Sequence, residues 1–265
     1  MNATAKNITD SPALLEIKNV DKAFGGIRAL KNISFCLQQG SITGLIGPNG
    51  AGKTTLFNLI TGIFPADRGE ITFNGRSVNG FQVYDLVGLG IARTFQNVEL
   101  FESMTALENI MVGLHTRTKC GMIGSMLRLP YIIEEERRVA QKAFELLEFV
   151  GLGKHAHQKS SDLPFGWQRL LELARALAAE PELLLLDEPA AGLNMSETRE
   201  LGELIRQIRD QGVSILLVEH DMNLTMSVSD KIVVLDQGEK IAEGPPRAVQ
   251  SDEAVMAAYL GKAKK

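Results

Sequence analysis

Apolar runs alternate with a helical pattern in the second half of this chain and predict a parallel β-sheet covered by helices. Residues 183–186 are consecutive leucines, and residues 213–218 form a second, mostly apolar run. Such runs are typical of parallel strands that are buried on both faces. Between them, residues 196–210 place apolar side chains at helical spacing. This order of strand, helix and strand favours an α/β fold.

The first part of the chain carries shorter strand signals. Residues 14–20, 33–37 and 71–73 are rich in Ile, Leu, Phe and Val, and turn residues such as Gly25 and Gly26 separate them. Short runs bounded by turns indicate β-strands that pair with their neighbours along the chain. We therefore expect an antiparallel β part in front of and behind the first parallel strand.

The middle of the chain has a helical character. Strand signals are scarce from residue 106 to residue 151, and the apolar positions of residues 134–150 fall on one helical face. These features predict an inserted helical subdomain. A further helix is expected at residues 167–179, a hairpin around residues 236–238, and a short helix within the tail at residues 245–265.

The composition is that of a globular protein. The chain has 265 residues, 45% of them hydrophobic, and its 28 basic and 32 acidic residues give a formal charge of −4, which argues against a general affinity for nucleic acid or anionic lipid. Cys36 and Cys120 are too few for a disulfide framework, and we expect Cys36 to be a reduced, buried thiol. No apolar run approaches the length of a membrane span, and residues 1–13 lack the pattern of a signal peptide.

A glycine-rich stretch at residues 47–54 fits the phosphate-loop pattern G-x-x-x-x-G-K-[ST] and lies between an apolar run and a helical pattern. Its residues are Gly47, Pro48, Asn49, Gly50, Ala51, Gly52, Lys53 and Thr54. The backbone N–H groups of such a loop face an anion. Lys53 would reach the β- and γ-phosphates, Thr54 would offer its hydroxyl to Mg²⁺, and Thr55 would cap the turn or contact the α-phosphate. A plain glycine-rich turn is the alternative, which the complete match disfavours.

Polar residues follow both apolar runs, at the sheet edge where open α/β sheets bind ligands. Asp187 and Glu188 follow the first run, and His220 follows the second. An aspartate beside a phosphate loop can hold Mg²⁺, and the next carboxylate can accept a proton from the attacking water. His220 could donate to the γ-phosphate. The simpler alternative for Asp187 and Glu188 is a pair of solvated carboxylates without a function. For His220 it is a histidine on the surface or in the core, and the residues alone favour this alternative.

Taken in order, these elements resemble the nucleotide-binding subunits of ABC transporters. The resemblance covers nearly the whole chain and implies a P-loop, RecA-like ATPase core of residues 1–92 and 171–265 with a helical subdomain at residues 93–170. It implies that Phe24 stacks on adenine, although a phenylalanine beside a turn more often packs in the core. It also implies that Gln96 joins the core to the helical subdomain and ligates Mg²⁺ or water.

The resemblance assigns further segments to contacts between subunits. Residues 163–168 match the family's signature motif, residues 191–194 match the segment that faces a partner subunit, and His220 matches the switch histidine. The sequences of residues 92–98, 187–194 and 258–261 resemble those of the ATPase subunits of branched-chain amino acid importers. The import of branched-chain amino acids is therefore the expected process.

The signature motif departs from the usual Leu-Ser-Gly-Gly-Gln of the family. Here it reads Leu163, Pro164, Phe165, Gly166, Trp167 and Gln168. Pro164 has neither a hydroxyl nor an N–H, so Gly166 and the following helix N-terminus are left as donors to the γ-phosphate. Trp167 packs either at the seam of the dimer or within the helical subdomain.

The resemblance implies a complete set of cofactors and partners. ATP and Mg²⁺ are the expected cofactors, and the expected partners are a second ABC ATPase subunit in a homodimer or heterodimer, integral membrane permease subunits and, indirectly, a solute-binding protein, with no nucleic acid. The chain is expected in the cytoplasm, peripheral on the inner face of the cell membrane. A soluble ABC ATPase acting on ribosomes or DNA is the alternative, as is the ATPase of a lipid exporter. The former usually carries a second phosphate loop or long heptads, and the sequence has neither.

A docking cleft for the membrane subunit is expected beside the glutamine loop. The residues expected to line it are Gln96, Val98, Leu100, Phe101 and Met104. An ordinary core segment would have the same apolar character, so exposure of these side chains distinguishes the two interpretations.

Overall fold

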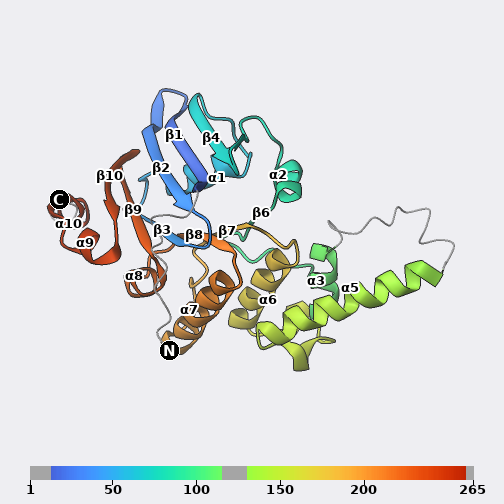
Figure 1. The fold of residues 1–265 in the computed structure, drawn as a ribbon. Coiled ribbons are helices and arrows are strands. Elements are labelled where there is room, and N and C mark those ends of the chain that lie inside the picture. The colour runs from blue at the N-terminus through green and yellow to red at the C-terminus, as the bar shows by residue number, and fades with distance from the viewer. Residues whose placement is uncertain (1–12, 115–129, 261–265) are drawn as a thin grey trace, which may run out of the picture.

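Two β-sheets lie next to each other, with helices packed around the larger one (Figure 1). The computed structural model describes residues 13–114 and 130–260. Helices α3 (Ala106–Leu114), α5 (Pro130–Phe149) and α6 (Phe165–Leu177) extend to one side of the sheets, and α9 (Pro246–Gln250) and α10 (Glu253–Leu260) lie on the other side (Figure 1). This arrangement agrees with the expected α/β class and with an antiparallel β part.

The larger sheet has the strand order β10-β9-β3-β8-β7-β6. Its strands are β3 (Ile42–Ile46), β6 (Ile91–Arg93), β7 (Leu183–Asp187), β8 (Ser214–Val218), β9 (Lys231–Asp236) and β10 (Glu239–Gly244). All neighbours from β9 to β6 pair in parallel, while β10 pairs with β9 through the expected hairpin. The two apolar runs therefore form adjacent parallel strands, as predicted.

The smaller sheet is antiparallel, with the order β2-β1-β4-β5. Its strands are β1 (Ala13–Phe24), β2 (Ile27–Gln38), β4 (Arg68–Phe73) and β5 (Arg76–Ser77). The expected strands are confirmed, but β1 and β2 are much longer than the pattern indicated. Asn19 has a φ of 50°, and the register shifts between Ile17 and Val20. A bulge interrupts the alternation of inward and outward side chains, so the alternating pattern ends before the strand does.

The helices predicted after the phosphate loop, at residues 134–150, 167–179 and 196–210 and in the tail are present to within a few residues, whereas the helices at residues 83–89 and 222–228 were not predicted. The described helices are α1 (Lys53–Ile60), α2 (Val83–Leu89), α3 (Ala106–Leu114), α5 (Pro130–Phe149), α6 (Phe165–Leu177), α7 (Met195–Asp210), α8 (Met222–Val228), α9 (Pro246–Gln250) and α10 (Glu253–Leu260), with short 3-10 turns η3 (Gly153–His155) and η4 (Ser160–Asp162). Helix α6 runs through residue 170, where the expected subdomain ends, so it joins the two parts of the chain. The division into core and subdomain remains a prediction.

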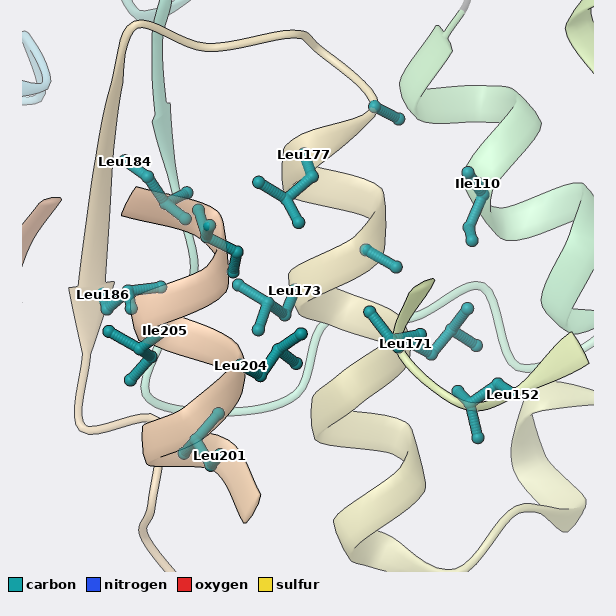
Figure 2. Close-up of a cluster of buried hydrophobic side chains, with 14 of the residues drawn as sticks. Ile110, Leu152, Leu171, Leu173, Leu177, Leu184, Leu186, Leu201, Leu204 and Ile205 are labelled. Atoms are coloured by element: carbon teal, nitrogen blue, oxygen red, sulfur yellow. The ribbon is translucent and has the colours of Figure 1, made fainter. Parts of the chain in front are cut away.

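The side chains of β7 alternate between two hydrophobic cores. Leu184 and Leu186 belong to the cluster shown in Figure 2, which also contains leucines of α6 and α7. Leu183 and Leu185 belong to the second cluster, which contains the small sheet and α1. All four are fully buried. A strand packed on both faces needs apolar residues at every position, which explains the unbroken leucine run.

Cys36 differs from the expectation of a buried thiol. It is a free thiol, as expected, but it is only partly buried. Successive residues of a strand face opposite sides, and Phe35 and Leu37 on either side of Cys36 point into the core. Cys120 lies outside the described residues, as do residues 1–12 and the basic end of the tail. Of the helices in the described part of the chain, none combines the length and the apolar character of a membrane span.

Gly44, in the middle of β3, gives a test of the packing between this strand and α8. A methyl group added there would lie 2.7 Å from Cδ1 of Ile232, 2.8 Å from Oγ of Ser229 and 2.8 Å from Cγ2 of Thr225. We expect Gly44→Ala to lower the free energy of unfolding by about 1 to 3 kcal/mol through overpacking. Chemical denaturation measures this change. Gly88→Ala is the control, since its added methyl meets nothing within 4 Å and removes a helical glycine, and it is expected to stabilise by up to about 1 kcal/mol.

Candidate functional site

The loop between β3 and α1 is built on glycines with left-handed backbone conformations. Gly47, Gly50 and Gly52 have φ values of 152°, 80° and 105°. A Cβ on Gly47 would lie 2.1 Å from the carbonyl oxygen of Leu235, and one on Gly52 would lie 2.8 Å from that of Ala29. Only glycine fits these two positions. The sequence therefore forms the strand, loop and helix that a phosphate-binding loop requires.

Lys53 is the first residue of α1, and its ammonium group lies against the loop. Its Nζ donates hydrogen bonds to the carbonyl oxygens of Gly47, at 2.7 Å, and of Pro48, at 3.2 Å. The lysine is buried, whereas Thr54 is exposed. The structure thus places a positive charge at the loop and a hydroxyl at its mouth, as the pattern predicted.

A cavity of about 630 Å³ opens beside this loop. Its lining includes residues 49–55 together with Ile27, Arg28, Glu188 and His220. The cavity therefore brings the phosphate loop together with residues that follow two different strands of the large sheet. This is the juxtaposition that the carboxyl ends of parallel strands produce.

Gln96, Glu188 and His220 form a chain of side-chain contacts. The Nε2 of Gln96 donates to Oε2 of Glu188 at 3.1 Å, and Nε2 of His220 lies 3.0 Å from Oε1 of the same carboxylate. The parallel pairing of β7 with β8 holds Glu188 beside the end of β8, because its N–H donates to the carbonyl of Val218 at 2.8 Å. The structure thus brings together all three residues for which catalysis was predicted.

Asp187 is buried and paired with a residue that the sequence analysis left without a role. Its Oδ2 lies 2.6 Å from Nη2 of Arg93, whose other terminal nitrogen donates to Asn58 at 2.7 Å and to Thr61 at 3.2 Å. Arg93 ends β6, next to β7. A lone arginine at the end of a short strand gave no signal in the sequence, because its partners are far away along the chain.

The oxygen donors predicted for Mg²⁺ have suitable chemistry. Thr54, Gln96 and Asp187 offer a hydroxyl, an amide and a carboxylate, and hard oxygen donors are what Mg²⁺ prefers. No group of three His, Cys, Asp or Glu side chains is arranged for a metal anywhere in the part of the chain that the structure describes. Mg²⁺ is commonly held by one or two protein carboxylates together with nucleotide phosphates, so this donor set fits it.

Phe24, the predicted adenine-stacking residue, lies at the end of β1 and packs edge-on against Phe64, with ring centroids 5.4 Å apart. It is 42% exposed. Among the described residues, the lining of the cavity includes the neighbouring Ile27 but not Phe24. Stacking of Phe24 on a base stays a prediction.

The signature stretch forms the start of α6. Pro164 occupies the N-cap position, and its carbonyl oxygen accepts hydrogen bonds from Trp167 and Gln168. The Trp167 ring lies 4.4 Å from the ring of His155, so it packs within its own subdomain while remaining 37% exposed. A Cβ on Gly166 would come within 3.0 Å of Oε1 of Glu197. The signature glycine therefore packs closely on the start of α7.

One face of α6 holds the loop that carries Gln96. Arg169 donates to the carbonyl oxygens of Phe95, at 3.1 Å, and of Gln96, at 2.5 Å, and Glu172 accepts a hydrogen bond from the N–H of Phe95 at 3.2 Å. Arg175, one turn further on, donates to the carbonyl of Glu99. Burial raises the pKa of Glu172 and lowers that of Arg175. This set of charged side chains, spaced by three residues, was not predicted from the sequence.

A second cavity of about 460 Å³ lies where the docking cleft was expected. Its lining residues are Val87, Ala92, Arg93, Glu99, Leu100, Phe101, Val112, Gly113, Glu172, Arg175, Ala176 and Ala179. Of the five residues expected in this lining, it contains Leu100 and Phe101 but not Gln96, Val98 or Met104. Phe101 is 46% exposed. Its exposure disfavours the alternative of an ordinary core segment.

The C-terminal helix α10 also reaches the phosphate loop. Burial raises the pKa of the Tyr259 hydroxyl, and a hydrogen bond with the backbone of Gly47 opposes this effect. Val249 and Val255 pack on Ile46, the last residue of β3. The tail, for which a short helix was predicted, therefore packs against β3, the strand that leads into the phosphate loop.

Curated proteins are similar to this chain over nearly its whole length, and two family models match parts of it. A model described as ABC transporter matches residues 30–191, and one described as Branched-chain amino acid ATP-binding cassette transporter matches residues 239–265. The high-affinity branched-chain amino acid transport ATP-binding protein LivG of Salmonella typhimurium is 43% identical over 254 residues, which are 96% of this chain and 100% of that protein. The corresponding protein BraF of Pseudomonas aeruginosa is 40% identical with the same coverage.

Solved structures give a similar result. The ADP conformation of an ATP-binding cassette of an ABC transporter has a TM-score of 0.83 and 32% sequence identity, with 95% of this chain and 100% of that chain covered. A dimeric post-hydrolysis state of another cassette, bound to ADP and Pi, has a TM-score of 0.74 and 27% identity, with 88% of this chain and 99% of that chain covered.

Proposed function

This chain belongs to the ABC transporter family, and we propose that it is the subunit that hydrolyses ATP to power the import of branched-chain amino acids. One observation carries the catalytic part of the proposal: Gln96 and His220 both contact the carboxylate of Glu188. Glu188 and His220 also line the cavity of the phosphate loop.

ATP binds along the phosphate loop. The backbone N–H groups of the loop and the N-terminus of α1 face its β- and γ-phosphates. Lys53, whose ammonium lies on the carbonyls of Gly47 and Pro48, exchanges these acceptors for phosphate oxygens and neutralises their charge. Thr54, Asp187 and Gln96 would hold Mg²⁺, which would supply further neutralisation of the phosphate charge.

Glu188 accepts the proton of the attacking water. Its carboxylate is oriented from both sides, by the amide of Gln96 and by the imidazole of His220. A base fixed in this way needs little reorganisation when the reaction begins. When ATP is bound, the Nε2–H of His220 that now reaches Glu188 turns to the γ-phosphate beside it, and Gln96 connects this chemistry to α6 through the backbone contacts of Arg169.

A second ATPase subunit completes the site. The related cassette whose structure is dimeric supports this part of the proposal, and the partner is either an identical chain or a similar one. In the dimer the signature stretch, with Gly166 and the N-terminus of α6, caps the nucleotide of the partner. The cleft around Phe101 receives a segment of an integral membrane permease, so the subunit is peripheral on the cytoplasmic face of the membrane.

The transported amino acid touches the permease and a solute-binding protein rather than this chain. Support for branched-chain amino acids comes from LivG and BraF relatives that are 40–43% identical over almost the full length. The same relatives disfavour the export of lipids and a role on ribosomes or DNA.

Replacing the proposed base separates nucleotide binding from hydrolysis. Glu188→Gln keeps a hydrogen-bonding side chain of similar size but cannot accept the proton, so we expect single-turnover ATP hydrolysis to fall by at least about 100-fold while ATP still binds. Glu70→Gln, on β4 in the antiparallel sheet, is the control and should hydrolyse ATP normally. If Glu188→Gln hydrolyses ATP at the parental rate, Glu188 is not the base.

Restoring a hydroxyl in the signature stretch should strengthen the dimer. Pro164→Ser adds a charge-assisted hydrogen bond to the γ-phosphate of the partner site, worth about 1.5 to 3 kcal/mol. Sedimentation of the variant in the Glu188→Gln background with ATP measures this gain. Serine at this N-cap position also stabilises α6 by about 1 kcal/mol, which the melting temperature of the monomer reports separately. Unchanged dimerisation would show that residue 164 does not contact the partner's nucleotide.

A charge in the cleft should block docking without unfolding the subunit. Phe101→Glu places a carboxylate where an apolar partner segment is expected, so association with permease-containing membranes should weaken by about 2 kcal/mol or more, with melting temperature and ATP binding retained. Tyr84→Glu is the matched control, since Tyr84 is 75% exposed on α2 and is not among the described residues that line the cleft. Normal membrane association of Phe101→Glu would refute the docking assignment.

A further inference from the structure

Glu219 is a buried carboxylate that the catalytic proposal does not use. It follows the last residue of β8 and is only 5% exposed. Its Oε1 accepts a hydrogen bond from the N–H of Ala190 at 2.7 Å, and its Oε2 accepts from the N–H groups of His220, at 2.7 Å, and Asp221, at 3.1 Å. Both carboxylate oxygens are therefore engaged by backbone donors.

These donors belong to two different loops. Ala190 lies two residues after Glu188, in the loop that leaves β7, and His220 and Asp221 lie in the loop that leaves β8. The two strands pair in parallel up to Asp187 and Val218, so the loops begin side by side. Beyond the sheet, Glu219 connects the backbone of one loop to the backbone of the other.

The distance between the catalytic side chains depends on the relative position of these loops. The imidazole of His220 lies 3.0 Å from the carboxylate of Glu188, with one residue on each loop. A small displacement of either loop would break this contact, and misplacement of catalytic groups by about 1 Å can cost about 100-fold in rate.

We propose that Glu219 is a positioning residue that fixes Glu188 and His220 relative to each other. This inference rests on the proposed function, because it needs Glu188 and His220 to be catalytic. A carboxylate suits the task because both of its oxygens only accept hydrogen bonds and can satisfy all of these N–H groups together. A glutamine of the same shape would turn an NH₂ group toward the N–H donors of one loop, so one of the two loops would be released.

The link also extends toward the dimer partner. Ala190 directly precedes residues 191–194, which the resemblance to ABC transporter subunits assigns to a contact with the second subunit. A shift of that segment on dimer closure would reach His220 through the Glu219 carboxylate. The catalytic pair would then be aligned best in the closed dimer.

The test is a mutant cycle between Glu219 and His220. In single-turnover hydrolysis of radiolabelled ATP, Glu219→Gln is expected to lower the rate by about 10- to 100-fold, with the affinity for ATP changed by less than about 2-fold. In a His220→Ala background, the same substitution should change the remaining rate by less than about 2-fold, because the contact it supports is already gone. Asp230→Asn is the matched control: Asp230 also accepts a backbone N–H, from Ile42 at 2.8 Å, but at the opposite edge of the sheet. It should leave the rate unchanged.

Each result has a defined meaning. An unchanged rate in Glu219→Gln overturns the inference, as does an equal loss of rate in both backgrounds, which would indicate a general structural role. If Glu219→Gln does not fold, Glu219→Asp keeps the charge but is too short to span both loops, and the same dependence on His220 is required of it. Normal hydrolysis by Glu188→Gln or His220→Ala would instead refute the proposed function, and that failure is distinguishable because it does not involve Glu219.

Discussion

The register between β7 and β8 is the constraint on which the site depends. These strands pair in parallel from Leu183 with Ser214 to Asp187 with Val218, so both end at the same level. Glu188 directly follows β7, and His220 follows β8 after Glu219; the proposed function assigns the chemistry to Glu188 and His220. A slip of β7 by one residue would put the charged Glu182 or Asp187 at a position that a buried leucine now holds. The hydrophobic packing therefore protects the position of Glu188 beside His220.

The two cavities are separate, but Arg93 and helix α6 connect residues near one cavity with residues near the other. Arg93 lines the docking cleft and binds the carboxylate of Asp187. Helix α6 carries the signature stretch at its start, holds the backbone of Gln96 with Arg169, and lines the cleft with Glu172 and Arg175. A continuous set of side-chain contacts thus connects the cleft with the residues proposed to bind and hydrolyse ATP, and the proposed coupling to a membrane partner requires such a connection.

The features that could be predicted from the sequence are those encoded locally. The phosphate loop was predicted because its glycines and Lys53 are adjacent, and β7 and β8 because burial on both faces leaves an unbroken apolar run. Contacts between distant segments could not be predicted. Two such contacts are that of Arg93 with Asp187, 94 positions apart, and that of Glu219 with Ala190, 29 positions apart. The sequence around each of these residues does not identify its partner. The length of β1 was missed because a bulge breaks its alternation.

The packing of Trp167 against His155 has a practical consequence. Trp167 is the only tryptophan in the chain, and it lies beside the signature glycine with a third of its surface exposed. The tryptophan fluorescence of the protein therefore originates from a single place, the surface that is expected to meet a partner's nucleotide. Without any label, the emission of this one indole reports on the polarity around the signature stretch, so it would reveal a partner subunit that covers this surface.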